Sequence, residues 1–307
     1  MEYILQTHSL TKKYKKHLAV DGANMNIARG DIYGFVGENG SGKTTIIRLV
    51  TGLIFPDRGG FTLFGVENTD PGINAARRKV GAIVETPSIY ANLSAYDNLK
   101  MQSMILGIND EDRIRQVLEE VGLGELYGNK KQAGDFSLGM RQRMGIAMAL
   151  LGEPEFLILD EPMNGLDPAG IVEIRELILR LNREKGITFL ISSHILTELA
   201  LVANKYGVIS KGKIIREITE EELHKECSRN TVIRTDKPAA LEAIVRKALP
   251  EHQVTPVAEG VKISGEVDLN TLLGAIGKEN IQILSVNCTE STFEDYYLSM
   301  IGGNRNG

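Results

Sequence analysis

Apolar and alternating stretches near the N-terminus predict three short strands followed by a helix. The strands are expected at residues 3–7, 23–27 and 31–36, and a polar run at 11–17 separates the first two. The third strand enters a glycine-rich loop, after which apolar side chains recur at helical spacing as far as Thr51. The expected order is therefore strand, glycine loop, helix.

The next long stretch has the spacing of helices. From residue 90 to 152 apolar positions recur every three or four residues, Ser94 and Asp97 resemble a capping box, and Gly122 suits a helix end. This pattern predicts an all-helical insertion.

Continuous apolar runs then return, as expected for strands buried on both faces. Runs at 156–159 and 188–192 enclose a helical segment at 171–184, which predicts parallel strands joined by crossover helices. A third run at 206–209 leads through a turn at Gly212 into a further strand.

A charged stretch at residues 216–230 is interpreted as a helix plus linker and marks the expected domain boundary. Thr219 and Glu222 would form its capping box. We expect a main domain over 1–218, with its helical subdomain at about 88–152, and an accessory domain over 219–307. For the second domain the patterns predict a small α+β unit, with strands at 231–235, 253–258, 261–267 and 281–288 and helices after Asp236, after Asp268 and at a cap formed by Ser291 and Glu294.

Composition narrows the class of partner. The 307 residues are 42% hydrophobic and 24% charged, close to globular averages, and the net charge of -5 lacks the basic surplus of a protein that follows a phosphate backbone. A nucleic-acid partner is therefore disfavoured, and the lysines at 12, 13, 15 and 16 are expected to form a solvated face.

Cys227 and Cys288 are interpreted as reduced thiols of a cytosolic protein. No apolar run approaches the roughly 18 residues of a bilayer span, so any membrane pathway would belong to partner subunits.

The glycine loop fits the phosphate-binding pattern G-x-x-x-x-G-K-[ST]. Glycines allow successive backbone N–H groups to surround phosphate oxygens, while Lys43 would neutralise the terminal phosphates and the Thr44 hydroxyl would bind Mg²⁺. A chance match in a glycine-rich turn is the alternative, and the strand–loop–helix order argues against it. The candidate nucleotide-binding residues are Gly37, Glu38, Asn39, Gly40, Ser41, Gly42, Lys43, Thr44 and Thr45.

Two carboxylates end the apolar strand at 156–159. Asp160 would hold Mg²⁺, and Glu161 would polarise an attacking water, because phosphoryl transfer needs a positioned nucleophile. Many strands end in solvated acids, so the catalytic interpretation of Asp160 and Glu161 depends on the phosphate-binding loop upstream.

The segment at 136–143 starts a helix at Ser137, whose hydroxyl suits either an anion site or a simple helix cap.

The order of these motifs resembles the ABC transporter ATPases from about residue 1 to 215. The resemblance implies a P-loop α/β cassette, with a parallel-sheet core, an N-terminal antiparallel β subdomain and a helical subdomain. It also implies that ATP binds between two copies in a head-to-tail dimer. Ser137 and Gly139 would contact the γ-phosphate held by the second chain, and Asp167 would lie in the dimer-crossing loop at 164–168.

The same resemblance assigns three further residues. His194, after the run at 188–192, corresponds to the family's switch histidine, which contacts the γ-phosphate and holds the attacking water with Glu161. Tyr14 matches the aromatic residue that stacks on adenine, and Val20 would line the ribose side. Stacking discriminates little between bases, so the preference for ATP rests on the family.

Two departures from the family pattern narrow the resemblance to one branch. Glu85 replaces a glutamine that reaches magnesium and the transmembrane partner, and residues 136–140 replace the usual leucine-serine-glycine-glycine-glutamine signature. Together with Thr86, Pro87 and the segment at 293–297, they resemble the ATPase subunits of bacitracin and lantibiotic self-protection exporters. This branch implies a homodimer on the cytoplasmic face of the membrane beneath separately encoded permeases, expelling a peptide antibiotic.

Three alternatives remain open at this point. The exporter could carry another cargo, such as a lipid or a drug, because the cargo-binding surface belongs to the permease. A soluble ABC-type ATPase acting on ribosomes or DNA is disfavoured by the single cassette and the acidic charge. A nucleotide sensor without turnover is disfavoured because Lys43, Asp160, Glu161 and His194 are all present.

Overall fold

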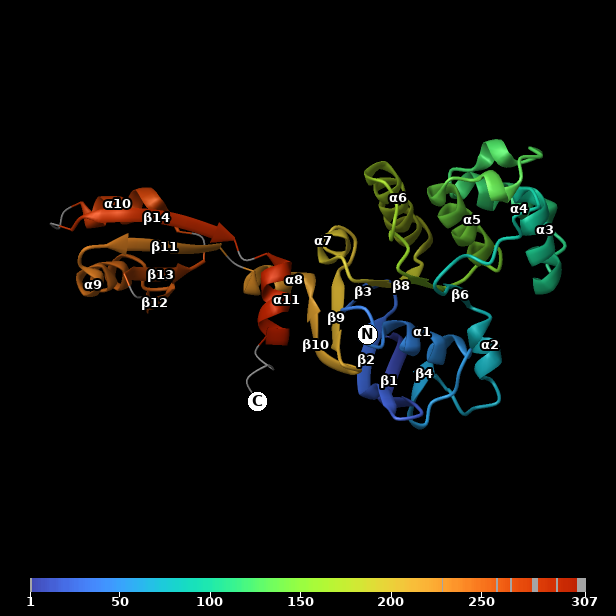
Figure 1. Ribbon diagram of the computed structural model, residues 1–307, viewed down its shortest axis with the longest axis horizontal. Coiled ribbons are helices and arrows are strands. Elements are labelled where there is room, and N and C mark those ends of the chain that lie inside the picture. Colours follow the sequence, from blue (N-terminus) through green and yellow to red (C-terminus); the bar gives the residue numbers. More distant parts are fainter. Residues whose placement is uncertain are drawn as a thin grey trace. The chain divides into compact units, whose positions relative to one another are not determined.

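The computed structural model describes residues 2–227, 229–257, 259–265, 267–277, 281–290 and 292–302. The chain forms two compact units, Met1–Glu220 and Glu221–Gly307 (Figure 1). The boundary expected from the sequence falls after residue 218, two positions before the division between the units.

A six-stranded, mostly parallel sheet forms the centre of the first unit. Its order is β10 (Lys213–Thr219), β9 (Lys205–Ser210), β3 (Ile32–Val36), β8 (Thr188–Ser193), β7 (Phe156–Asp160) and β6 (Val80–Ile83). β3, β7 and β8 are buried along their whole length, as strands covered on both faces must be, which explains their continuous apolar sequences. Only β10 is antiparallel to its neighbour. The parallel core expected from the sequence is confirmed.

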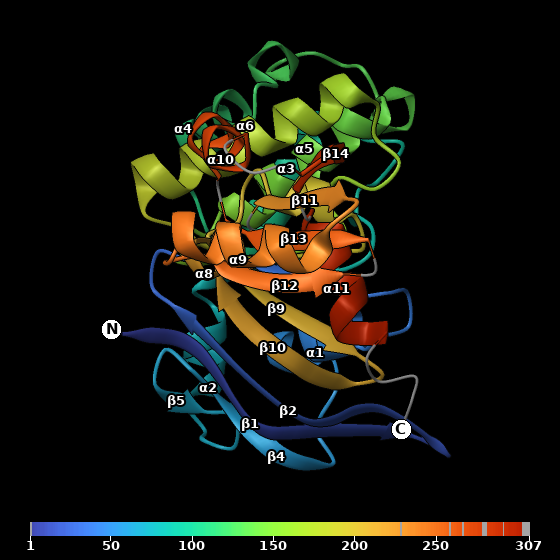
Figure 2. The same ribbon diagram turned by 90° about the vertical axis from the view of Figure 1, so that its left-hand side faces the viewer.

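An antiparallel sheet forms the second layer, with the order β2 (His17–Ala28), β1 (Tyr3–Tyr14), β4 (Arg58–Leu63) and β5 (Val66–Glu67). The expectation that the polar run 11–17 separates two short strands is wrong. β1 and β2 continue through it and meet in a tight hairpin at Lys15, whose φ is 53° (Figure 2). The hairpin tip is exposed, so its polar residues do not interrupt the pairing.

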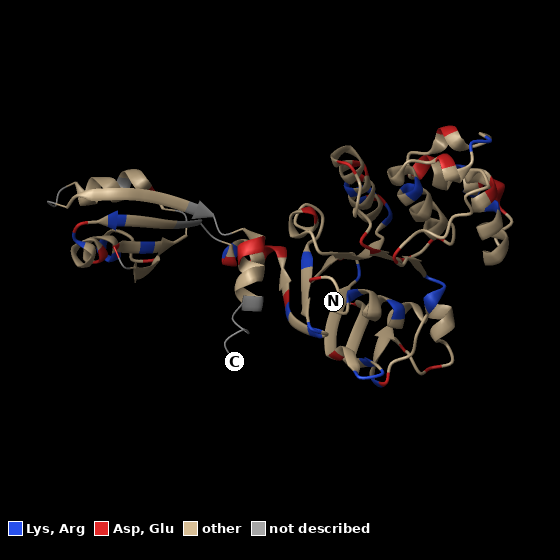
Figure 3. Cartoon of the chain, in the orientation of Figure 1, with Lys and Arg blue, Asp and Glu red and all other residues tan. Residues whose placement is uncertain are grey.

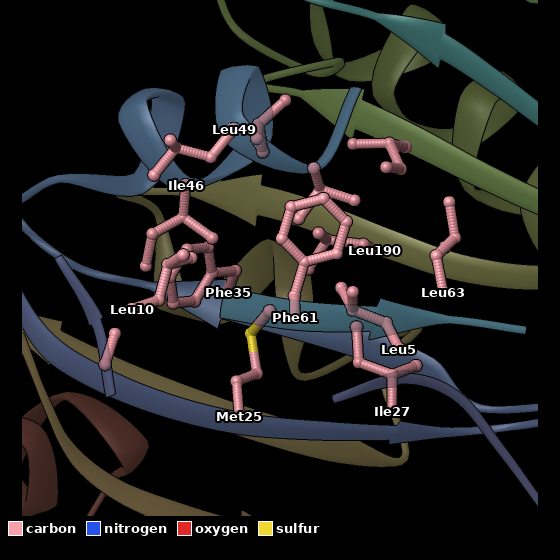
Figure 4. Packing of buried hydrophobic residues seen from close by; sticks show 14 of the residues in the cluster. Leu5, Leu10, Met25, Ile27, Phe35, Ile46, Leu49, Phe61, Leu63 and Leu190 are labelled. Carbon is pink, nitrogen blue, oxygen red and sulfur yellow. The ribbon is translucent and has the colours of Figure 1, made fainter. Parts of the chain in front are cut away.

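The helix after the glycine loop, α1 (Lys43–Thr51), packs in the core shared by the two sheets. Ile46 and Leu49 of this helix meet Phe35 of β3 and Phe61 of β4, and all four side chains are buried (Figure 4). This packing fixes the start of α1 at the end of β3. A short helix, α2 (Ile73–Arg77), joins the same core through Ile73.

The helical insertion contains α3 (Ala95–Leu106), α4 (Glu111–Glu120) and α5 (Leu138–Leu150), with 3-10 turns η1 (Gly124–Leu126) and η2 (Ala133–Asp135). Ser94 caps α3 by accepting a hydrogen bond from the Asp97 N–H at 3.1 Å, as expected. Positively and negatively charged residues are interspersed along these helices in Figure 3. The first unit is completed by α6 (Pro168–Lys185) and α7 (Leu196–Leu199).

The second unit is a four-stranded antiparallel sheet with helices packed against it. Its elements follow the order β11 (Arg229–Thr235), α9 (Pro238–Ala248), β12 (Gln253–Val257), β13 (Gly260–Ser264), α10 (Leu269–Ile276) and β14 (Ile283–Glu290). The sheet order β12-β13-β11-β14 with this βαββαβ sequence is the ferredoxin-like arrangement. Its core is a cluster of aliphatic side chains centred on Ile233, Leu241 and Val261.

Two short helices flank this sheet in sequence: α8 (Glu220–Glu226) and α11 (Phe293–Gly302). The start of the charged stretch, expected to be helical from residue 216, is strand β10 as far as Thr219. Ser291, the expected cap of the last helix, lies outside the described residues. Among the helices of the described residues, none combines the length and apolar character needed to cross a membrane.

Candidate nucleotide-binding and hydrolysis site

The loop between β3 and α1 has the backbone conformation of a phosphate cradle. Gly40 and Gly42 have φ values of 79° and 113°, which L side chains rarely adopt. At Gly37 a Cβ atom would lie 2.5 Å from the carbonyl oxygen of Ile209, so only glycine fits between the loop and β9. The Ser41 hydroxyl is buried without a hydrogen-bond partner among the described residues, as expected for a group that a ligand would satisfy.

Lys43 closes the loop onto itself. Its ammonium group donates to the carbonyl oxygens of Gly37 at 2.6 Å and Glu38 at 3.3 Å, and it lies 3.3 Å from a carboxylate oxygen of Glu161. Only about a twentieth of the lysine is exposed. A buried ammonium group held by carbonyl oxygens is ready to exchange these contacts for phosphate oxygens.

Asp160 lies at the carboxyl end of β7 and is 1% exposed. Its Oδ2 accepts a 2.8 Å hydrogen bond from the Thr44 hydroxyl, and its Oδ1 accepts a 2.5 Å hydrogen bond from the Ser192 hydroxyl. Buried carboxylates need such donors. The structure therefore brings together the two oxygen groups, from Thr44 and Asp160, that were expected to hold Mg²⁺.

Ser192 is a contributor that the sequence did not reveal. Its hydroxyl donates to Asp160 and also accepts a hydrogen bond from the Glu161 N–H at 2.9 Å, so it fixes both carboxylate residues. It lies on β8, which pairs with β7 in parallel and places Ser192 beside Asp160. A serine at the end of a strand gives no signal of this role in the sequence alone.

Glu161 and His194 form the expected dyad. The His194 Nδ1 lies 2.8 Å from Glu161 Oε2, while Glu161 Oε1 lies near Lys43. Glu161 has a φ of 53°, an unfavourable conformation for a residue with a side chain, and such strain concentrates at functional sites. A carboxylate held by a histidine on one oxygen can orient and polarise a water molecule for in-line attack on a phosphate.

A pocket of about 290 Å³ opens beside the glycine loop. Tyr14, His17 and Ala19 of the β1–β2 hairpin line it, as does Glu161. The remaining lining residues are Asn39, Gly40, Ser41, Gly42, Lys43, Thr44 and Thr45. Tyr14 is 40% exposed, so its ring is accessible for stacking.

Val20, expected to line the ribose side, is instead fully buried in the core. Side chains alternate along β2, so Ala19 and His17 face the pocket while Val20 points to the opposite side. Which side chains of β2 face the pocket depends on the register of the strand, and the sequence motif does not predict that register.

Ser137, Gly139 and Asp167 do not line this pocket. Ser137 caps α5 by accepting from the Met140 N–H at 3.2 Å, and Asp167 caps α6 by accepting from the Gly170 N–H at 2.9 Å. The two helix starts are neighbours, because a Cβ atom on Gly165 would lie 3.3 Å from the Leu138 side chain. Ser137, Gly139 and Asp167 thus form a second group of candidate nucleotide-binding residues, which does not line the pocket beside the phosphate loop of the same chain.

Glu85 lies after β6 and makes a contact that the sequence did not indicate. Its Oε1 accepts a 2.6 Å hydrogen bond from the Arg48 guanidinium of α1. The role of Glu85 as a magnesium ligand stays a prediction.

Comparisons with known proteins identify the family of the chain. The family model for the ABC transporter matches residues 20–164. The chain is 41% identical to the bacitracin transport ATP-binding protein BcrA of Bacillus licheniformis over 99% of both chains. It is 45% identical to the lantibiotic transport ATP-binding protein SrtF of Streptococcus pyogenes, over 70% of this chain and 90% of that protein.

Solved structures give the same fold. CbiO1 from Clostridium perfringens, described as part of the ABC transporter complex cbiONQ, matches with a TM-score of 0.65 and 29% identity, over 81% of this chain and 97% of that chain. The dimeric ATP-binding cassette MJ0796 bound to ADP and phosphate matches with a TM-score of 0.63 and 24% identity, over 70% of this chain and 98% of that chain. With its phosphate loop and paired carboxylates, the chain belongs to the family of ABC transporter ATP-binding proteins and is an ATPase.

Proposed function

We propose that this ATPase drives the export of a peptide antibiotic of the bacitracin or lantibiotic type and thereby protects the cell that makes or meets it. The observation that carries the proposal is the similarity to the bacitracin transport protein, which spans both units of the chain. A second bacitracin transport ATP-binding protein, from Enterococcus faecalis, is 38% identical over 99% of this chain and 98% of its own length. Glu85 and the altered signature at residues 136–140 support the same branch.

Hydrolysis takes place between two copies of the chain in this proposal. The pocket of one chain supplies Lys43 and Glu161, and the helix start at Ser137 and Gly139 of the second copy covers the γ-phosphate. The backbone N–H groups and the dipole of α5 suit an anion at this position. Asp167, at the neighbouring helix start, would then lie at the dimer contact.

Mg²⁺ fits the oxygen donors that surround the phosphate loop. Thr44 and Asp160 offer a hydroxyl and a carboxylate oxygen that already meet at 2.8 Å, and hard divalent cations prefer such ligands. Together with phosphate oxygens, these two residues would hold the ion, which neutralises charge on the transferred phosphate. Glu85 is the third proposed ligand.

Permease subunits would dock on the apolar surface around a groove of about 380 Å³ between β6 and the helical insertion. Leu53 and Leu106 line this groove and are 63% and 47% exposed, and nearby in sequence Phe55 and Ile105 are 76% and 72% exposed. Exposed apolar side chains beside a groove support an interaction surface at this place. The chain would therefore act as a peripheral protein on the cytoplasmic face of the membrane.

Export can be tested in a bacterial host sensitive to peptide antibiotics. The chain is expressed with the membrane proteins encoded beside its gene, and the minimum inhibitory concentrations of bacitracin and of a lantibiotic are measured. We expect a higher inhibitory concentration for one of them, and Lys43→Ala should abolish the protection because the phosphates lose their cation. Protection against a lipid or drug challenge alone would assign the other cargo class and contradict the proposal.

A further inference from the structure

A pocket of about 300 Å³ in the first unit lies apart from the nucleotide-binding residues. Its volume is at the lower end of the range for small-molecule sites. Glu155 and Ile187, which line it, come immediately before β7 and β8, whereas Asp160 and Ser192 lie toward the carboxyl ends of the same two strands. Because β7 and β8 are parallel, this pocket and the phosphate-binding site lie at opposite edges of the sheet.

The pocket is lined by both parts of the first unit. Arg113 of α4 and Leu150 of α5 belong to the helical insertion. Arg29, between β2 and β3, and Lys185, the last residue of α6, belong to the core that carries the two sheets. A molecule bound in this pocket would therefore touch the insertion and the core together.

Arg113 is buried and keeps unused hydrogen-bond donors. The residue is 7% exposed, and its Nη1 donates to Glu120 at 3.1 Å and to Gln116 at 3.4 Å. Its Nη2 donates to the Leu150 carbonyl oxygen at 2.7 Å, while its Nε has no hydrogen-bond partner among the described residues. A guanidinium has five N–H groups, so the Nε–H and one N–H of Nη2 remain. These adjacent nitrogens form the fork that binds a carboxylate or a phosphate through two hydrogen bonds.

The charges around Arg113 favour an added anion. Arg113 and Lys185 share a single carboxylate oxygen, Glu120 Oε1, at 3.1 and 2.6 Å. Glu153 is 78% exposed, and its Oε1 lies 3.8 Å from the Arg113 Nε, which is beyond hydrogen-bond distance. A buried donor without a partner is unfavourable, so a ligand oxygen would make the hydrogen bond that Glu153 does not make.

The other carboxylate of the pocket already has its own cations. Glu155 lies 2.9 Å from the Lys79 ammonium and accepts a hydrogen bond from Arg29 at 2.7 Å. These hydrogen bonds, that of Lys79 first, lower the pKa of Glu155. Glu155 is therefore ionised and paired, and it leaves Arg113 and Lys185 available to a ligand.

We propose that this pocket binds a small oxyanion, the carboxylate or phosphate ester group of a metabolite, on the fork of Arg113. Lys185, whose side chain is 39% exposed, supplies the second positive charge. A planar guanidinium fork accepts either group, so the chemistry that the site recognises is the oxyanion. The inference is independent of the exported cargo, because both walls of the pocket belong to the single chain.

The test is a binding measurement on the full-length chain. A nonhydrolysable ATP analogue with Mg²⁺ fills the phosphate loop, and succinate and glycerol phosphate are then titrated separately. NMR follows the Nε–H resonances of an isotope-labelled chain, in which the Arg113 signal is the one lost in Arg113→Lys. We expect at least one of the two probes to shift this signal with a Kd of about 1 mM or below. A response to succinate assigns a carboxylate ligand, and a response to glycerol phosphate assigns a phosphate ester.

Three substitutions separate the contributions to binding. Lys185→Gln should weaken binding of the probe by about ten-fold, because a hydrogen bond between charged groups is lost. Arg113→Lys keeps the charge but loses the fork, so it should weaken binding at least as much. Glu153→Gln removes the negative charge beside the fork and should strengthen binding by about two-fold or more.

Lys100→Gln is the matched control for Lys185→Gln. Lys100 lies 2.7 Å from Glu111 and is 37% exposed, close to the values for Lys185 and Glu120, but it does not line the pocket. It should leave binding unchanged. The inference is overturned if neither probe shifts the Arg113 signal, or if Lys185→Gln binds the probe as tightly as Lys100→Gln. Both of these measurements remain valid if Arg113→Lys does not fold, because the two lysines are partly exposed.

Discussion

Ser192 donates a 2.5 Å hydrogen bond to Asp160 and receives one from the Glu161 N–H at 2.9 Å. One hydroxyl on β8 therefore sets the positions of both carboxylate residues at the end of β7. Ser192 therefore helps to hold the candidate catalytic and metal-binding groups in place.

We expect Ser192→Ala to reduce both stability and turnover. Removal of the hydroxyl leaves the buried Asp160 oxygen without its donor, which costs about 1–3 kcal/mol in the free energy of unfolding. ATP turnover should fall by about ten-fold or more, because groups that orient metal ligands have effects of this size. Ser193→Ala is the control, since the Ser193 hydroxyl forms hydrogen bonds with the backbone of the nearby Ile195. Equal turnover of the two variants would show that Ser192 does not position the site.

The hydrogen bond between Thr44 and Asp160 leads to a prediction about metal dependence. Thr44→Ala should weaken ATP binding by about ten-fold in the presence of Mg²⁺ and much less in EDTA, because the lost hydroxyl is a proposed metal ligand. Thr45→Ala serves as the comparison, since Thr45 also lines the pocket and should affect binding equally in both conditions. Isothermal titration of ATP into each variant gives the ratio. The same ratio for Thr44→Ala and Thr45→Ala would exclude Thr44 as a ligand.

A buried tyrosine predicts a loss of stability at alkaline pH. Tyr33 is fully buried and donates to Glu217 at 2.9 Å, and burial followed by the Glu217 charge raises the pKa of its hydroxyl well above the usual value. The unfolded chain ionises this tyrosine above about pH 10, whereas the folded chain keeps it neutral, so stability is present below that pH and lost as pH rises.

Tyr33→Phe should therefore be less stable than the native chain near neutral pH, by about 1 kcal/mol for the lost hydrogen bond. The difference should shrink or reverse between about pH 9 and 11. Urea unfolding over this range measures it, with the exposed Tyr90→Phe as control. A difference that does not change with pH would refute the assignment.

Local patterns predicted the parts of the molecule that depend on neighbouring residues. The phosphate loop, the helix caps at Ser94 and Ser137 and the buried strands all follow from spacing within short segments. The hairpin at 11–17 was missed because its polar residues pair as strands while remaining exposed.

Contacts between residues far apart in the sequence could not be predicted from local patterns. Ser192 and Asp160 are 32 positions apart and Arg48 and Glu85 are 37 apart, and each meets its partner only through sheet pairing or helix packing. Val20 was placed on the wrong face of β2 because the register of that strand is set by its pairing with β1.

We propose that ATP is hydrolysed in a site shared by two copies of the chain, with Glu161 activating the water. The most direct measurement is the molecular mass of purified Glu161→Gln by size-exclusion chromatography with light scattering, in the presence of ATP and Mg²⁺. We expect a stable dimer, because ATP binds but cannot be cleaved, and a return to monomer when Ser137→Arg is added to block the second half of the site. A Glu161→Gln chain that binds ATP and remains a monomer would show that the site is not shared between two copies.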